Sequence, residues 1–207
     1  WMGDTNYSTS SFALIIFCGM VILNIFSEGI SGSVFAISGN PNYVKKVVFP
    51  LEIIPVSYVL SSLILGCAWL IVLMSGIIIC RNSITCSVLA LPLLILPLIL
   101  CECGLAWFVS SLGVYFRDLY HIIGLLLQML FFLTPVFYSV EMIPVQYRRI
   151  LLVNPLAEIV ENMRVILIFG KWPCWTGLGL LILGSWVIFH LGYIWFMKTK
   201  RGFADVL

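Results

Sequence analysis

The feature that most constrains this chain is a set of long apolar runs, each close to the length that crosses a lipid bilayer. The clearest covers residues 56–79, which include no charged side chain. A spanning helix needs about 20 mostly apolar residues, and backbone groups in lipid must be hydrogen-bonded internally. Of 207 residues, 62% are hydrophobic and 10% are charged, which excludes a soluble domain of ordinary composition. We therefore predict an all-α fold, a polytopic bundle of transmembrane helices.

Five such runs are predicted to span the membrane. They are residues 12–26, 56–79, 88–113, 122–138 and 176–196. The first reaches span length only if the polar residues at its ends are included. The chain is expected to form a single membrane domain over residues 1–207. Because it opens on Trp1 and not on Met, we expect its natural start to lie upstream.

The third predicted span carries a carboxyl group, Glu102, near its middle. A carboxyl group there must face protein or water, so Glu102 is a candidate functional residue, and a structural hydrogen bond to a neighbouring helix is the alternative. Cys101 and Cys103 flank it, but two thiols one residue apart with no histidine nearby do not favour a metal site. Cys80 and Cys86 flank a short reversal, where a disulfide would require an oxidising compartment.

A charged stretch, residues 40–55, separates the first two predicted spans, and we call it the elbow. Asn40 and Pro41 favour a helix start, whereas Pro50 and Pro55 act as stops. We expect a short helix that lies flat on the membrane surface. Its charged side chains, predicted to face water, are Lys45, Lys46 and Glu52. A basic anchor for anionic headgroups explains the same pattern equally well.

The elbow pattern N-x-x-K-K-x-x-F-P-x-E-I-x-P, at residues 42–55, resembles the cytoplasmic elbow of ABC transporter membrane subunits of the type-2 exporter class. It is most similar to permeases that export O-antigen, capsular polysaccharide or teichoic acid. The resemblance implies a coupling helix over residues 42–50 that docks on a separate ATPase subunit. The F-R-D sequence at residues 116–118 resembles the second cytoplasmic turn of that family. The ATPase contacts so implied are Asn42, Lys45, Lys46, Phe49, Pro50, Glu52, Arg117 and Asp118.

The region 139–175 is too polar to span and too apolar for a free loop, which predicts short re-entrant or interfacial helices. Asn154 and Pro155 favour a helix start within it. The strings T-P-V-F-Y-S and V-N-P-L-A-E-I-V-E-N-M-R resemble the extracytoplasmic gate region of the same exporters. The implied gate residues are Pro135, Asn154, Pro155, Glu158 and Arg164.

The family has six spans and an N-terminal amphipathic helix, so the resemblance implies that this helix and the first span are missing from the sequence. Placing the elbow, the Arg117 turn and the tail in the cytoplasm puts six Lys and Arg residues inside and five outside. This is a weak preference under the positive-inside rule. The implied location is the bacterial inner membrane, with multiple passes.

The sequence lacks the G-x-x-x-x-G-K-[ST] phosphate loop, so ATP and magnesium are expected on a partner subunit and no cofactor on this chain. The resemblance implies a homodimeric pore, two ATPase copies and a lipid-linked polysaccharide as cargo, in contact with membrane lipid. No nucleic-acid partner is expected, since the basic residues are scattered over membrane-flanking loops. Substrate-path candidates are Phe12, Phe17, Phe26, Glu102, Phe131, Phe132 and Tyr138; for each aromatic, helix packing or lipid contact is the alternative.

Two other functions remain open at this point. One is a type-2 permease for drugs or other lipids, which differs from a glycan exporter only in family-level motifs. The other is a membrane enzyme acting on a polyprenyl-linked substrate, which would need clustered carboxylates or histidines near a membrane face. The acidic residues here are dispersed along the chain, and only two histidines are present. The transporter hypothesis is therefore favoured.

Overall fold

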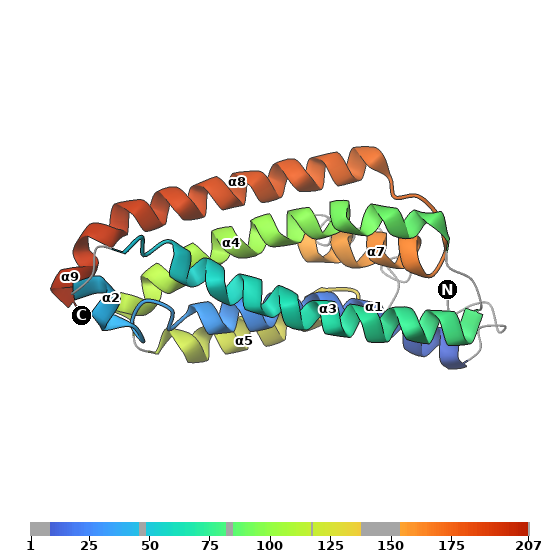
Figure 1. Ribbon diagram of the computed structural model, residues 1–207, viewed down its shortest axis with the longest axis horizontal. Coiled ribbons are helices and arrows are strands. Elements are labelled where there is room, and N and C mark those ends of the chain that lie inside the picture. The colour runs from blue at the N-terminus through green and yellow to red at the C-terminus, as the bar shows by residue number, and fades with distance from the viewer. Residues whose placement is uncertain (1–8, 46–48, 82–84, 117, 138–153, 207) are drawn as a thin grey trace.

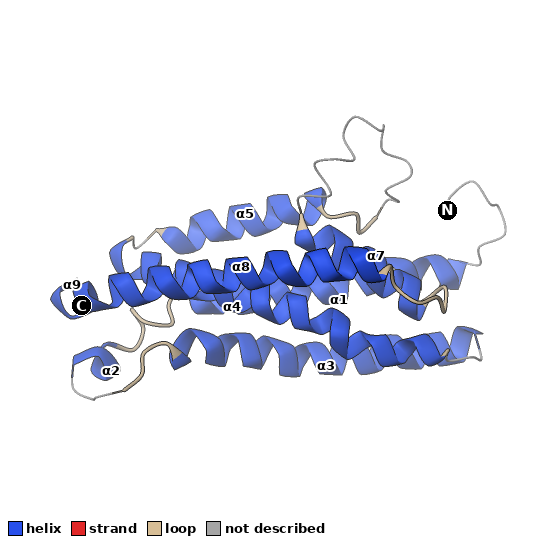
Figure 2. Cartoon of the chain, turned by 90° about the horizontal axis from the view of Figure 1, so that it is seen from above, coloured by secondary structure: helices blue, strands red, loops and turns tan. Residues whose placement is uncertain are grey.

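The structure is a computed structural model that describes residues 9–45, 49–81, 85–116, 118–137 and 154–206. Every regular element in these ranges is a helix, and the long helices run side by side in one elongated bundle (Figures 1 and 2). The predicted all-α bundle is therefore confirmed.

In the part of the chain that the structure describes, four helices are long and apolar enough to cross a membrane. They are α1 (Thr9–Ser33), α3 (Ile53–Arg81), α4 (Leu91–Tyr115) and α8 (Trp175–Thr199). The shorter elements are α2 (Pro41–Lys45), η1 (Cys86–Ala90), α5 (Leu119–Leu133), α7 (Pro155–Leu167), η3 (Lys200–Gly202) and α9 (Phe203–Val206). Four of the five predicted spans correspond to these long helices.

The remaining predicted span, residues 122–138, is the fourth along the chain, and both of its ends were placed wrongly. Its helix, α5, begins at Leu119 and ends at Leu133, so its 15 residues cover about 22 Å of a hydrocarbon layer about 30 Å thick. Thr134 has an extended backbone, with ψ at 134°. The cause is Pro135, whose ring disfavours the helical conformation in the residue before it.

One expectation about the elbow needs correction, and one is confirmed: α2 begins at Pro41, directly after Asn40. Pro55 does not stop the chain before the second span, because α3 already begins at Ile53, and proline is tolerated in the first helical turn. Asn40 precedes α2 as expected, but its side-chain Nδ2 donates to the carbonyl oxygen of Ala36 at 3.0 Å. This bond attaches the start of the elbow to the segment that follows α1.

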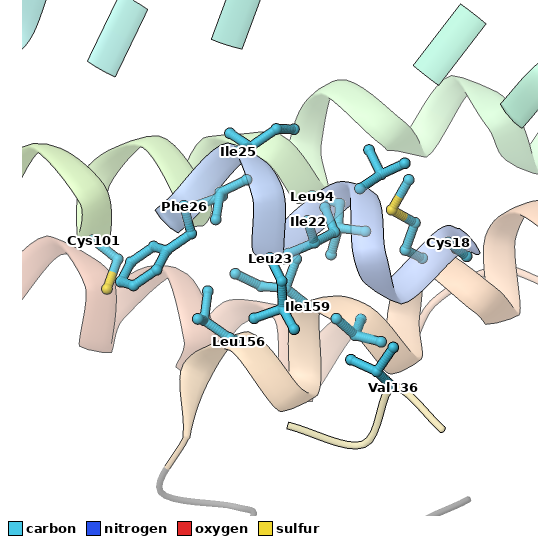
Figure 3. Packing of buried hydrophobic residues seen from close by; sticks show 14 of the residues in the cluster. Cys18, Ile22, Leu23, Ile25, Phe26, Leu94, Cys101, Val136, Leu156 and Ile159 are labelled. Carbon is cyan, nitrogen blue, oxygen red and sulfur yellow. The ribbon is translucent and has the colours of Figure 1, made fainter. Parts of the chain in front are cut away.

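Helix α1 lies at the centre of the bundle, in contact with α3, α4, α5 and α7. Figure 3 shows its buried side chains, including Cys18, Ile22 and Phe26, packed against Leu94 of α4 and Ile159 of α7. Between helices in lipid the stabilisation comes mainly from van der Waals packing, not from removing apolar area from water. The outer helices α3 and α8 leave most of their apolar side chains exposed, as expected for lipid-facing helices.

Helices α4 and α8 form the most extensive helix pair, and they approach closely at two glycines. A Cβ added to Gly192 would lie 2.6 Å from the carbonyl carbon and 2.8 Å from the Cα of Gly104. A Cβ added to Gly104 would lie 2.5 Å from the carbonyl oxygen of Ile188. Small residues allow two membrane helices to approach this closely.

The two functional regions predicted from the sequence lie at opposite ends of the bundle (Figure 1). The elbow helix α2 lies at the same end as α9. Tyr115, at the end of α4, reaches the tail, since its ring lies 6.2 Å from that of Phe203. Helix α7 lies toward the other end, where Ser87 of η1 donates a hydrogen bond to the Ile166 carbonyl at 2.9 Å.

Candidate functional site

The elbow is held by aromatic packing. The rings of Tyr43 in α2 and Phe49 lie 5.3 Å apart. Phe49 also packs beside buried apolar residues that include Leu51 and Phe196. The elbow therefore lies against the end of α8 instead of projecting freely from the bundle.

Glu52 connects the elbow to two spanning helices. Its carboxylate accepts a hydrogen bond from Lys200 Nζ at 2.7 Å, and its backbone carbonyl accepts one from Trp107 Nε1 in α4 at 2.9 Å. We call Glu52, Lys200 and Trp107 the elbow latch. Partial burial raises the pKa of Glu52, but the hydrogen bond and charge of Lys200 outweigh it, so the pKa lies below the usual carboxyl value. Glu52 is therefore a paired carboxylate at neutral pH.

The other predicted ATPase contacts are only partly described. Asn42 and Pro50 are exposed, and Phe49 is partly buried. Asp118 is exposed at the start of α5. Lys46 and Arg117 lie outside the described residues, and Lys45 is described only as the last residue of α2. Of the predicted contacts that are described, Asn42, Phe49, Pro50 and Glu52 belong to the elbow.

The gate region is organised around a buried guanidinium. Arg164 is 2% exposed and donates to three oxygens on different segments. Its Nη2 lies 2.7 Å from the Val136 carbonyl, its Nη1 3.0 Å from Glu161 Oε1, and its Nε 3.4 Å from the Ile15 carbonyl. A buried cation is stable only when its donors are satisfied in this way. Arg164 thus ties α7 to α1 and to the segment that follows α5.

Asn154 begins α7 as predicted. Its side-chain oxygen accepts from the Leu156 N–H at 3.0 Å, and its Nδ2 donates to Thr134 Oγ1 at 3.1 Å. Pro155 is the first residue of the helix. Together with Arg164 these contacts join the Thr134–Pro135 turn and α7 into one unit, which we call the gate unit. The role of this unit as a gate stays a prediction.

Glu158 faces a cavity and not the contacts that Arg164 and Asn154 make. It lines a cavity of about 560 Å³ between α7 and α8 together with Cys174, Gly184 and Ser185. Burial raises its pKa above the usual carboxyl value. Glu158 therefore takes no part in the hydrogen bonds described for Arg164.

Glu102 is completely buried between three helices. Its Oε1 lies 2.8 Å from Ser62 Oγ of α3, and the Cβ of any larger residue at Gly29 of α1 would collide with it. Among the described residues, no hydrogen-bond partner is present for Glu102 Oε2. In this single chain the carboxyl group contacts neighbouring helices and does not line any of the cavities described here. Its assignment to the substrate path stays a prediction.

The aromatic path candidates do not converge on one surface. Phe12 is exposed, Phe17 packs on Trp69 at 6.2 Å, and Phe26 is buried in the core. Phe131 packs on Phe132 and Phe137 near the end of α5. Tyr138 lies outside the described residues. The path therefore also remains a prediction.

Several residues that position these regions were not predicted. Lys200, Trp107, Thr134 and Ser62 each contact a predicted residue from a distant part of the chain. The cysteines considered for a disulfide, Cys80 and Cys86, are free and exposed. Among the described residues, no group of three His, Cys, Asp or Glu is placed to hold a metal ion.

The fold and these regions define a class: a multi-pass helical membrane protein with an elbow at one end and a short buried helix toward the other. A family model described as ABC-2 type transporter matches residues 2–168, and the chain belongs to that family. The resemblance inferred from the motifs is confirmed.

Proteins similar to this chain are named for export or for transport. An O-antigen export system permease protein of Klebsiella pneumoniae is 25% identical over 198 residues, covering 95% of this chain and 76% of the relative. One of Myxococcus xanthus is 27% identical over 200 residues, covering 94% and 76%. A polysialic acid transport protein of Escherichia coli is 26% identical over 185 residues, covering 88% and 71%.

Proposed function

We propose that this chain is the transmembrane subunit of an ATP-driven exporter that moves a lipid-linked polysaccharide across the bacterial inner membrane. Two copies form the pore, and two copies of a separate ATPase subunit bind the elbows. The chain itself performs no chemistry. The observation that carries the proposal is membership of the ABC-2 family together with relatives named for O-antigen export and for polysialic acid transport.

The geometry of the elbow supports a mechanical role. An ATPase subunit that pulls on α2 acts on a segment joined to α4 through Trp107 and to the end of α8 through Lys200. Since α4 and α8 are the most extensive helix pair, a displacement of the elbow moves them together. Rigid-body movement of packed helices is an established way to change a protein's internal passage.

The gate unit supports a role for the opposite end of the bundle as the exit of the cargo. Arg164 and Asn154 fix α7 beside the end of α5, so α7 follows any displacement of α1 or of the Thr134–Pro135 turn. A glycan would leave past this unit. Relatives named for polysaccharide export favour glycan cargo over drugs or other lipids.

Reconstitution tests the proposal. The chain is purified together with the ATPase subunit encoded beside it and is placed in vesicles whose outer leaflet holds the lipid-linked glycan. We expect ATP-dependent transfer of glycan into the lumen, measured as protection from an external glycosidase. The control is the ATPase with its phosphate-loop lysine replaced. Protection that is equal with the control, or with no ATPase present, would contradict the proposal.

A further inference from the structure

A cavity of about 860 Å³ opens between the elbow and the end of α8. The elbow forms one wall, and the last turns of α8 with η3 form the other. Its aromatic and charged lining consists of Tyr43, Phe49, Tyr193, Lys198, Lys200 and Arg201. The proposed coupling role assigns no ligand to this space.

The charge of the cavity is positive. Lys200 is already paired with Glu52 at 2.7 Å, which leaves the charges of Lys198 and Arg201, both exposed. No acidic side chain belongs to the described lining. A cation at a helix C-terminus is expected from the helix dipole, and this accounts for Lys198. It does not account for Arg201, which follows the helix and lines an open cavity together with aromatic side chains.

The cavity also has an apolar side. Val44 and Leu51 of the elbow and Ile194 and Met197 of α8 complete its wall. The candidate span of α8 ends at Gly202, so the cavity lies where the chain passes from hydrocarbon to water. Tyrosine, lysine and arginine are the residues that membrane proteins place at this level.

We propose that this cavity binds the phosphate headgroup of an anionic membrane lipid. Arg201 suits a phosphate because guanidinium binds its oxygens in pairs, and Lys198 adds a second positive charge. The apolar wall receives the first methylenes of the acyl chains. Basic pockets between helices at the membrane surface bind such headgroups. The lipid bridges the elbow and α8, and the inference holds whether or not the proposed cargo is correct.

The test is native mass spectrometry of the purified full chain, with or without its ATPase subunit, after incubation with phosphatidylglycerol or phosphatidylcholine. We expect one tightly retained phosphatidylglycerol per chain and no tightly retained phosphatidylcholine. Lys198→Gln and Arg201→Gln should each weaken retention about fivefold. Lys171→Gln is the control, because Lys171 is exposed and follows α7 toward the other end of the bundle; it should not change retention.

A second variant separates a pocket from general surface charge. Val44→Trp fills the cavity without changing charge and should abolish the tightly bound phosphatidylglycerol. Retention that survives Val44→Trp, or that Lys171→Gln weakens equally, would overturn the proposal in favour of nonspecific attraction. Displacement of the lipid by millimolar inorganic phosphate would also overturn it, because the site would then take the free anion. Equal retention of phosphatidylcholine would contradict it as well.

Discussion

The close approach of α4 and α8 gives a sharp prediction for Gly192→Ala. The new methyl group would lie 2.6 Å from the carbonyl carbon and 2.8 Å from the Cα of Gly104, whereas carbon atoms in contact are about 3.5–4.0 Å apart. Both neighbours are backbone atoms and cannot rotate away. The two helices must therefore separate by about 1 Å along this seam.

The magnitude follows from that separation. A gap of about 0.5–1 Å forfeits a quarter to a half of each contact's attraction, and overpacking a close-packed interior costs about 1–3 kcal/mol. Because this seam is the most extensive helix pair, we expect a loss near the upper value, about 3 kcal/mol. For a chain of this size that lowers the melting temperature by about 6–12 °C.

The assay is thermal unfolding of the purified chain in detergent, followed by loss of the monodisperse peak in size-exclusion chromatography. Gly184→Ala is the matched control on the same helix, because among the described residues a Cβ at that position meets no atom within 4 Å apart from its chain neighbours and the backbone of its own helix. It should leave the melting temperature unchanged or raise it slightly, since alanine favours a helix by about 1 kcal/mol over glycine. Equal melting temperatures for the two variants would refute the packing argument.

Four further predictions concern the polar contacts. Replacing Glu52 or Lys200 by alanine should cost less than about 1 kcal/mol of folding stability, because the pair is partly exposed. A double-mutant cycle should show coupling between the two residues. Purely additive losses of stability would contradict the elbow latch. The pKa of Glu52 is lowered in the folded chain. The Glu52 carboxylate therefore contributes fully to folding stability above the unfolded pKa of about 4.5, and this contribution is lost as the pH falls through the lower folded pKa. The stabilities of wild type and Glu52→Gln should therefore converge on acidification. Arg164→Leu should cost about 3 kcal/mol or more of folding stability, because buried carbonyl oxygens lose a charged donor, and Arg164→Lys should cause an intermediate loss. A melting temperature like that of wild type for Arg164→Leu would contradict the structural role given to the hydrogen bonds of Arg164. Glu102→Gln should keep the folded yield and the contact with Ser62 while altering export if the carboxylate is functional, and parallel loss of both would make it structural.

The long helices were predictable because an apolar run needs only local information. The end of α5 was also available from the sequence, since Pro135 constrains the residue before it. Because the residues after Pro135 are apolar, the span was predicted to continue to residue 138, although the backbone ends the helix before Pro135. Local proline chemistry overrode the hydropathy pattern at that point.

The partners of the polar residues were not predictable from sequence. Glu52 was expected to face water, yet it pairs with Lys200, 148 residues away. Arg164 was identified by motif, but the Ile15 carbonyl that it contacts is 149 residues away. Spacing along the chain contains no information about such contacts, because they depend on which helices pack together.

In the proposed mechanism, the elbow passes mechanical work from a separate ATPase to the helices behind it. The most direct measurement is photo-crosslinking of the assembled transporter with benzoylphenylalanine placed at Asn42, which is exposed in α2. The matched position is Trp172, exposed beyond α7 toward the other end of the bundle. We predict an adduct with the ATPase subunit from position 42 and none from position 172. An adduct from position 172, or none from position 42 in a complex that copurifies, would contradict the account.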